Sequence, residues 1–332
     1  MPRTGLTMAG MVRRWPGDPA TDPGYRGAIP SLVALGDLAL DVSAALREPL
    51  MPGSDAAAAV RFRQGGSAAN TARMAARLGG RASFVGAVGR DSWGAALVRS
   101  LREASVTVHA PRVPAPTARI VVLVAPGGER SFATERGAAD GLLPAHLRPA
   151  WFRHDGLHLP AYSLFNAPLR DAAFAAAEMA RSAGAAISVD LASRRPLLAR
   201  GRQAARRDLL ALAPDLLVAN DEEAAALRGG RPREVLLDLA PVVVLKQGRA
   251  GCLVLVRRER EAMALAVATR AVDAPDTTGA GDAFDAGFLL SWLGAEPGKR
   301  DDLRVLRAAA LAGHRAAHRL LSTTRPELDP WR

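Results

Sequence analysis

The sequence predicts an α/β fold in which helices cover both faces of a mostly parallel sheet and a small β-sheet forms a lid over one edge. Two observations predict it. Short apolar runs alternate with alanine-, leucine- and arginine-rich stretches of helical character, which is the pattern of βαβ units. One early segment breaks this alternation with a hairpin pattern. We expect one domain at residues 30–325, after a disordered leader at 1–29 and before a tail at 326–332.

The apolar runs predict the buried strands of the parallel sheet. A run that ends in glycine or a polar residue after four to seven positions is typical of such a strand. The predicted strands cover residues 31–36, 82–88, 156–159, 186–189, 216–219 and 242–245. The helices predicted between them cover residues 68–78, 93–104, 169–183 and 202–212.

The lid is predicted from two segments without helical periodicity. Residues 118–124 and 130–134 are apolar or β-favouring, and the turn residues Pro126, Gly127 and Gly128 separate them. Residues 41–63 also lack a helical pattern. We therefore expect the lid strands at about 41–63 and 109–134.

Composition and charge exclude several classes of protein. The chain has 332 residues and a formal charge of +11, but its arginines are scattered without interleaved aromatic residues, so we expect no nucleic-acid partner. The single cysteine, Cys252, allows neither an intramolecular disulfide nor a structural zinc site of four cysteines. No apolar run approaches the roughly 20 residues that span a bilayer, so we expect a cytoplasmic protein without a membrane partner.

The most specific motif is the heptapeptide from Asp276 to Asp282, which precedes a predicted helix. Small residues at 279–281 allow the backbone to approach a ligand, and the start of a helix favours an anion. A carboxylate beside an anion site suits phosphoryl transfer to an alcohol, because one group holds phosphate and the other accepts the proton. An ordinary helix start with a glycine turn would give the same short pattern.

Five segments together resemble the ribokinase-like (PfkB-type) carbohydrate kinases. The heptapeptide D-x-x-G-A-G-D is similar to the C-terminal signature of that family, and Gly65–Asn70 is similar to its N-terminal signature. Between them lie counterparts of the family's G-x-V-G-x-D-x-x-G segment at 85–94, its N-x-x-E motif at 220–223 and its nucleotide-side glycine loop at 246–251. The resemblance covers about residues 31–325 and implies a ribokinase-like three-layer α/β/α domain with a lid.

The resemblance implies a role for each matching residue. The catalytic set comprises Asp282 as the base, and Gly279, Ala280 and Gly281 as backbone donors to the transferred phosphoryl group. The substrate-binding set comprises Asp37, Asp41, Gly66 and Asn70. The ATP-binding set comprises Asp190, Arg194, Asn220, Lys246, Gly248 and Gly251. An ordinary loop carboxylate at Asp41 and a surface lysine at Lys246 are the alternatives.

Two departures from related motifs bear on the substrate. Asp190 and Arg194 resemble the D-x-N-x-R segment of some fructokinases and ketodeoxygluconate kinases, but Ala192 replaces its asparagine. Ser67 stands where ribokinase itself has a lysine, which disfavours ribose.

Two metal sites are also implied. Asn220 and Glu223 are expected to hold Mg²⁺ through water, although the same pair would serve as a helix-capping box. Asp276 and Thr278 match a monovalent-cation site. Residues 322–326 lack the Gly-Ala that follows the last core helix in K⁺-binding relatives, so activation by K⁺ stays open.

The predicted activity is ATP- and Mg²⁺-dependent phosphorylation of a hydroxyl, expected to be primary, on a small sugar or sugar acid. The lid would exclude water and could pair with a second copy to form a homodimer. Two alternatives remain: a nucleoside kinase of the same superfamily, and a regulator that binds sugar or nucleotide without catalysis.

Overall fold

The computed structural model describes residues 28–258, 261–274, 276–323 and 326–330. The predicted leader therefore lies almost entirely outside the described residues. Within them, nine strands form one sheet in the order β15-β14-β13-β12-β11-β10-β1-β4-β6. All neighbours are parallel except at β14 and β15, which pair antiparallel at one edge. The strands of this large sheet are β1 (Ser31–Leu35), β4 (Arg81–Val85), β6 (Thr107–His109), β10 (Gly156–Pro160), β11 (Ala186–Asp190), β12 (Leu216–Asn220), β13 (Val242–Lys246), β14 (Cys252–Arg258) and β15 (Glu261–Val267).

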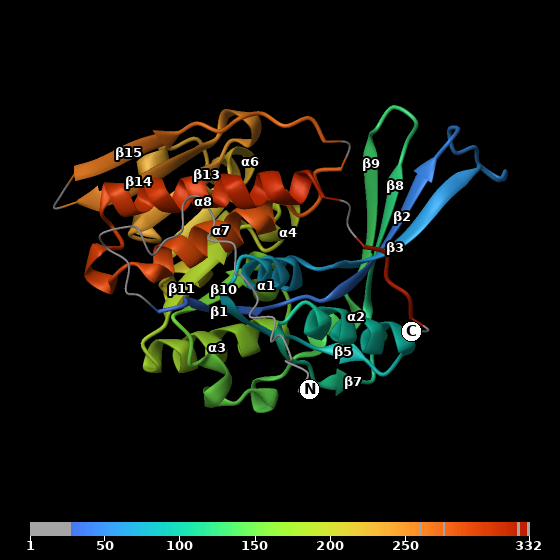
Figure 1. Ribbon diagram of the computed structural model, residues 1–332, viewed down its shortest axis with the longest axis horizontal. Coiled ribbons are helices and arrows are strands. Elements are labelled where there is room, and N and C mark those ends of the chain that lie inside the picture. Colours follow the sequence, from blue (N-terminus) through green and yellow to red (C-terminus); the bar gives the residue numbers. More distant parts are fainter. Residues whose placement is uncertain (1–27, 259–260, 275, 324–325, 331–332) are drawn as a thin grey trace, which may run out of the picture.

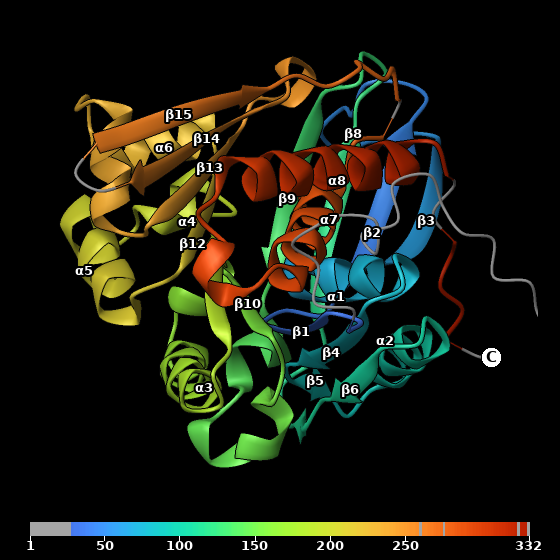
Figure 2. The same cartoon turned by 60° about the vertical axis from the view of Figure 1, so that its left-hand side comes forward.

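Helices cover both faces of this sheet, which confirms the predicted three-layer architecture. Alternate residues of a strand point to opposite faces, so Leu32 and Ala34 of β1 join one core and Val33 and Leu35 join the other. The first core also takes in α1 (Ser67–Arg77), α2 (Ser92–Glu103), α7 (Ala280–Gly294) and α8 (Leu303–Leu321). The second takes in α3 (Leu169–Ser182), α5 (Arg202–Leu212) and α6 (Asp221–Arg228), and the short α4 (Arg194–Leu197) precedes α5. Figure 2 shows α7 and α8 side by side, with α1 next to α7.

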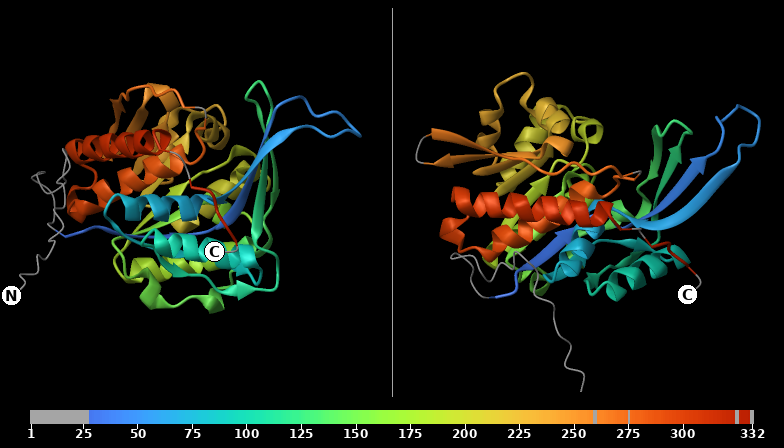
Figure 3. Two further views of the ribbon diagram at one scale, coloured as in Figure 1. Left: turned by 45° about the vertical axis from the view of Figure 1, so that its right-hand side comes forward. Right: turned by 45° about the horizontal axis from the view of Figure 1, so that its top comes forward.

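A separate sheet of four strands in the described chain projects from one end of the body (Figure 1). We call it the lid. Its order is β3-β2-β8-β9, with β2 (Ala39–Leu46), β3 (Ala58–Gly65), β8 (Ala118–Val124) and β9 (Arg130–Glu135). Both views of Figure 3 show the outer ends of its strands standing clear of the body.

The segment just before β8, expected with the lid, lies elsewhere. Residues 107–109 form β6 of the large sheet, and Arg112–Val113 form the short β7, which pairs with β5 (Val88–Gly89).

The carboxyl ends of the parallel strands collect polar side chains. Asp190, Asn220 and Lys246 are the last residues of three neighbouring strands, β11, β12 and β13. Ligands of open α/β sheets bind outside these ends, where helix N-termini also point. None of the described helices combines the length and apolar character needed to span a membrane.

Candidate active site

Two helices begin at the same place, beside the base of the lid. Gly66 caps the N-terminus of α1 with φ 95°, and Gly279 caps that of α7 with φ 81°. A side chain at either position would be strained, and a β-carbon on Gly66 would also lie 2.4 Å from the carbonyl oxygen of Asp37. Because the first N–H groups of a helix have no intrahelical acceptor, two such starts make this corner attractive to an anion.

Asp282 lies in the first turn of α7 and faces α1. Its Oδ1 accepts a hydrogen bond from Ser67 Oγ at 2.6 Å, and its Oδ2 accepts one from Asn70 Nδ2 at 2.9 Å. Gln64 Nε2 donates to Asn70 Oδ1 at 3.3 Å, which fixes the orientation of that amide. Burial raises the pKa of Asp282 to about 6, although the two hydrogen bonds favour its ionised form.

A buried ion network lies behind the glycine turn. Lys246 Nζ is 3.0 Å from Asp190 Oδ2 and 3.2 Å from Asp285 Oδ1, and both carboxyl groups are at most 5% exposed. A β-carbon placed on Gly281 would lie 3.3 Å from Lys246 Nζ, so the ammonium group lies against the backbone of the turn. The lysine predicted on the nucleotide side therefore also borders the turn that was predicted to bind the phosphoryl group.

The pKa values of the two carboxyl groups of this network shift in opposite directions. Burial raises the pKa of Asp285 well above its ordinary value. Burial acts on Asp190 in the same direction, but the Lys246 ammonium outweighs it and lowers the pKa of Asp190. Burial therefore favours the neutral form of Asp285, whereas Lys246 favours the ionised form of Asp190.

A neutral histidine lies beside this network. His158 is fully buried and shares a 2.9 Å hydrogen bond with Ser188 Oγ. Burial lowers its pKa to about 4, so it adds no charge near neutral pH.

Asn220 and Glu223 form the capping box of α6. Asn220 Oδ1 accepts from the Glu223 N–H at 2.9 Å, and the Glu223 carboxylate accepts from the Asn220 N–H at 2.9 Å and from Asn220 Nδ2 at 2.8 Å. Burial raises the pKa of Glu223, which is only 4% exposed. Each carboxylate oxygen holds one hydrogen bond and keeps a lone pair, which is compatible with a water-mediated contact to a metal. Among the described residues no group of three or more His, Cys, Asp or Glu side chains forms a metal cluster.

The predicted substrate residues lie at the base of the lid. Asp37 is nearly buried and 3.7 Å from the Arg136 guanidinium, which also binds Asp140 at 2.7 Å. The Arg136 guanidinium lies 5.5 Å from the ring centre of Tyr162. Asp41 packs so closely against the chain at Gly65 that a β-carbon there would lie 2.1 Å from its Oδ1.

The predicted nucleotide residues separate into two groups. Asp190, Asn220 and Lys246 lie together at the strand ends, and the loop with Gly248 and Gly251 follows β13 directly. Gly251 needs glycine, because its φ is 105° and a β-carbon would lie 2.2 Å from the Val267 carbonyl oxygen.

Arg194 is not joined to that group. It begins α4 at the surface, with its side chain 63% exposed and 4.0 Å from Glu222.

The lid reaches the turn before α7 through two arginines. Arg63 of β3 lies 3.2 Å from Asp276 Oδ2, and Arg130 of β9 lies 3.3 Å from Asp276 Oδ1. Arg130 also donates to Thr278 Oγ1 at 3.1 Å. The residues matched to a monovalent-cation site therefore contact two guanidinium groups.

Several residues of the site went unnoticed in the sequence. Asp285 carried a signal, because it is a lone charge in the apolar stretch that follows Asp282. Ser67 stood in a recognised motif, but only as a departure from it. Nothing in the sequence marked Arg63, Arg130 and Arg136 as site residues. Because 42 of the 44 basic residues are arginine, these three do not stand out from the others.

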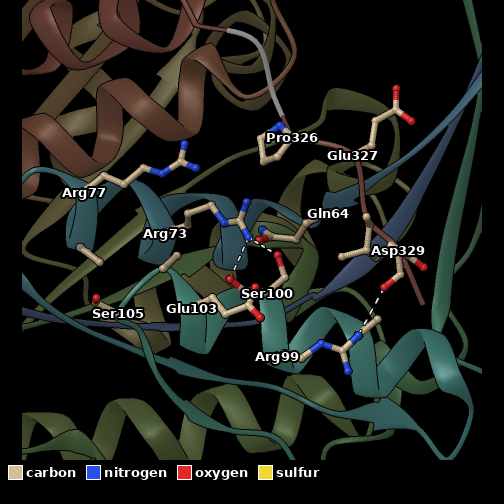
Figure 4. A pocket seen from close by; sticks show the side chains of 14 residues that line it. Gln64, Arg73, Arg77, Arg99, Ser100, Glu103, Ser105, Pro326, Glu327 and Asp329 are labelled. Atoms are coloured by element: carbon tan, nitrogen blue, oxygen red, sulfur yellow. Dashed lines mark hydrogen bonds between the residues drawn. The ribbon is translucent and has the colours of Figure 1, made fainter. Parts of the chain in front are cut away.

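A cavity of about 610 Å³ lies apart from Asp282, between α1, α2 and residues 326–329 (Figure 4). Arginines line it together with Glu103, Glu327 and Asp329, so its charges compensate one another. Gln64 lines it too and connects it to the site through Asn70. This balanced charge favours no particular ligand.

Comparisons with known proteins show the family and support the fold. The family described as pfkB family carbohydrate kinase matches residues 30–326. A fructokinase of Klebsiella pneumoniae is 34% identical over 256 residues, which cover 73% of this chain and 80% of that protein. An ATP-dependent ribose-1-phosphate kinase of Halopiger xanaduensis is 33% identical over 257 residues, which cover 75% of this chain and 80% of that protein. The structure of a fructokinase from Xylella fastidiosa with bound ATP has a TM-score of 0.75 at 25% identity, covering 89% of this chain and 93% of that one.

Proposed function

Because this chain belongs to the pfkB family of carbohydrate kinases and is a phosphotransferase with an alcohol acceptor, we propose that it phosphorylates a small sugar or sugar acid with Asp282 as the base. The observation that supports this most directly is the Asp282 carboxylate, oriented by Ser67 and Asn70 at the start of α7. A base whose pKa is about 6 is ionised at neutral pH yet still accepts a proton readily.

In the proposed reaction, Asp282 accepts the proton of the substrate hydroxyl. The hydroxyl oxygen bonds to the γ-phosphorus of ATP, and the bond from that phosphorus to the β–γ bridging oxygen breaks, so that ADP leaves. A primary hydroxyl is the least hindered acceptor for such an attack.

The start of α7 would stabilise the transferred group. The N–H groups of Gly279 and Gly281 are the proposed donors, whereas the Ala280 N–H already donates to the Thr277 carbonyl at 3.1 Å. Lys246 supplies a fixed positive charge directly behind Gly281. We therefore propose Gly279 and Gly281 as the main backbone donors, and the predicted role of Ala280 would require its N–H to leave the Thr277 carbonyl.

The nucleotide would lie along the ends of β11 to β13, beside Asp190, Asn220 and the loop with Gly248 and Gly251. Arg194 would reach it only from the surface. Mg²⁺, held through water by Asn220 and Glu223, would neutralise charge on the phosphates of ATP.

The sugar would lie between Asp37, Asp41, Gly66 and Asn70. Carboxylate and amide groups in fixed positions suit the hydroxyl groups of a sugar. The fructokinase from Klebsiella pneumoniae supports a ketose such as fructose as the first substrate to test. The Arg136 guanidinium, close to Asp37, would suit the carboxylate of a sugar acid.

A nucleoside kinase remains the second candidate, because the lid presents an aromatic residue. Phe132 is 63% exposed and pairs across β8 with Val122, on the same face of the lid as Asp41. A base could stack on this ring.

The decisive experiment measures ADP release with ATP and Mg²⁺ across ketoses, aldoses, sugar acids and nucleosides, with Asp282→Asn alongside. We expect turnover with one class of sugar and a loss of about three orders of magnitude or more in the variant. An Asp282→Asn protein within a few-fold of wild type would refute the assignment of the base. Binding of sugar or ATP without ADP release would favour the regulator instead.

We also propose a homodimer through the outer face of the lid. Val60, Phe62 and Val121 share that face and are 36–53% exposed. An apolar surface of this kind is stabilised when a second copy covers it.

A further inference from the structure

The residues that the resemblance matched to a monovalent-cation site do not suit a cation in this chain. A cation bound by their side chains would need the Asp276 carboxylate and the Thr278 hydroxyl, whose oxygens accept from hydrogen-bond donors instead. Arg63 Nη1 donates to one Asp276 oxygen at 3.2 Å, and the other is 3.3 Å from Arg130 Nη2 and 3.0 Å from the Thr278 N–H. Arg130 Nη1 donates to the Thr278 hydroxyl at 3.1 Å. Two guanidinium groups at these distances would repel a further cation.

We infer that Arg63 and Arg130 take the place of the monovalent cation at Asp276 and thereby fasten the lid to the turn before α7. We call these three residues the clasp. The inference rests on the proposed kinase activity of the same site. The two guanidinium groups would neutralise Asp276, as a bound cation would otherwise do.

The two arginines come from the two outer strands of the lid. The strand order β3-β2-β8-β9 places Arg63 on one edge and Arg130 on the other. The register puts both arginines on the same face of the lid. Arg63 pairs with Asp41, which pairs with Ile120 of β8, and Arg130 pairs with Val124 of β8. Ile120 and Val124 are four residues apart on one strand, so their side chains share a face. One carboxylate of the body therefore bridges both edges of the lid, which requires the lid to lie against the body.

The two arginines of the clasp are largely buried, and its carboxylate is partly exposed. The side chains of Arg63 and Arg130 are 13% and 23% exposed, and that of Asp276 is 37% exposed. Salt weakens such partly buried ion pairs less than it weakens exposed ones. The other ion pair of β3, between Arg61 and Glu327, has side chains 52% and 61% exposed and serves as a comparison.

Both ends of the clasp continue directly into the reaction site. Asp276 accepts a hydrogen bond from the Thr278 N–H and so shapes the turn that leads to Gly279. Arg63 lies three residues before Gly66, at the end of the strand that leads into α1. Fixing these two segments together would hold Asn70 against Asp282. Neutralising Asp276 would also reduce its repulsion of the phosphates of ATP.

The test compares ADP release in KCl and in choline chloride at equal ionic strength of about 0.1 M, with the substrate found by the panel above. Wild type is expected to show the same kcat/KM in both salts within about twofold. The Arg63→Met/Arg130→Met protein is expected to lose about tenfold or more in choline chloride. Arg61→Met, which removes the same charge from the same strand, is the matched control and should behave as wild type.

Each outcome decides the inference. A wild-type enzyme activated several-fold by K⁺ over choline would overturn it, as would a double variant with wild-type kcat/KM in choline. A double variant that regains activity with K⁺ supports the exchange of guanidinium for cation. A double variant that loses kcat/KM in both salts but keeps the Tm of wild type supports a clasp whose role K⁺ cannot take over.

A second readout does not depend on turnover. Hydrogen exchange of residues 118–135 should be faster in Arg130→Met than in wild type, because the β8–β9 hairpin loses its attachment to the body. Unchanged exchange would contradict the clasp even if no substrate were found. A failure of the proposed function is distinct, since it would appear as no ADP release from wild type in either salt.

Discussion

At the scale of the residue, the chemistry of the site depends on how burial divides charge among neighbouring carboxyl groups. Asp282 is buried enough to raise its pKa to about 6 but is still ionised at neutral pH. Asp285, one helical turn further along α7, is more deeply buried, and its pKa is raised well above the ordinary value. The same helix thus presents a proposed base and, beneath it, a buried carboxyl group that belongs to the Lys246 network.

This difference predicts the pH dependence of turnover. Since only the ionised carboxylate accepts a proton, kcat/KM should fall as the pH decreases through about 6. The raised pKa also means that ionising Asp282 costs folding free energy above that pH. Asp282→Asn should therefore raise Tm at pH 8, and the gain should disappear towards pH 4. A pH–rate profile flat from 5 to 8, or a variant with a lower Tm at pH 8, would contradict this.

The Lys246 network predicts unequal effects for its two carboxyl groups. Burial raises the pKa of Asp285 and so favours its neutral form, and Asp285→Asn supplies a neutral amide of the same shape, so we expect kcat to change by less than about tenfold. Asp190→Asn removes the carboxylate that balances Lys246 and should cost more in both kcat and Tm, as loss of one partner of a buried ion pair does. Kinetics and melting curves of the two variants side by side provide the check. Equal effects would contradict the assignment of Asp190 as the main counter-ion of Lys246.

At the scale of the element, helix starts do most of the positioning. The N-termini of α1 and α7 meet through their glycine caps, and α6 begins with a capping box at the end of β12. The capping alternative for Asn220 and Glu223 is confirmed. The Mg²⁺ role of this pair stays a prediction, and both can hold together.

A single substitution separates the two roles of Glu223. Glu223→Gln keeps an oxygen that can accept the Asn220 N–H but loses the hydrogen bond from Asn220 Nδ2, so the cap should persist and the Tm should fall by a few degrees at most. If the carboxylate also holds Mg²⁺ through water, the Mg²⁺ concentration for half-maximal rate should rise about tenfold. Glu222→Gln, an exposed neighbour on the same helix, is the control. A magnesium titration identical to wild type would remove the metal role and leave the cap.

At the scale of the whole molecule, the lid is the part that another copy of the chain can cover. Its inner face carries Asp41, Arg63 and Arg130 toward the site, whereas its outer face carries Val60, Phe62 and Val121. Phe62 is partly covered by Trp93 of α2, with ring centres 5.1 Å apart. The other two apolar residues of this face, Val60 and Val121, are 53% and 36% exposed.

We therefore expect light scattering at micromolar concentration to give twice the mass of one chain. Val60→Asp should return the protein to one chain, because it introduces a charge into the apolar contact. Thr134→Asp, on the opposite face of the lid, should leave the dimer intact. A wild-type protein of single-chain mass would refute the pairing.

By itself the sequence determined where most strands and helices of the body form and where the turn that begins α7 lies. The apolar runs and helical stretches fix local backbone conformation, and the seven residues from Asp276 to Asp282 are contiguous, so their pattern could be recognised directly. The three-layer fold, the separate lid and the carboxylate at the helix start were predictable for that reason. The roles given to the individual site residues stay predictions.

Only the tertiary structure decided which distant side chains meet. Ser67 and Asp282 are 215 positions apart, Arg63 and Asp276 are 213 apart, and Lys246 meets Asp190 across 56. Such contacts depend on the order of strands in the two sheets, which no local pattern of residues carries. Burial has the same origin: the pKa of Asp285 is raised and that of Asp190 is lowered because of what packs around each. The sequence alone could not distinguish a cation site at Asp276 from a clasp closed by arginines of the lid.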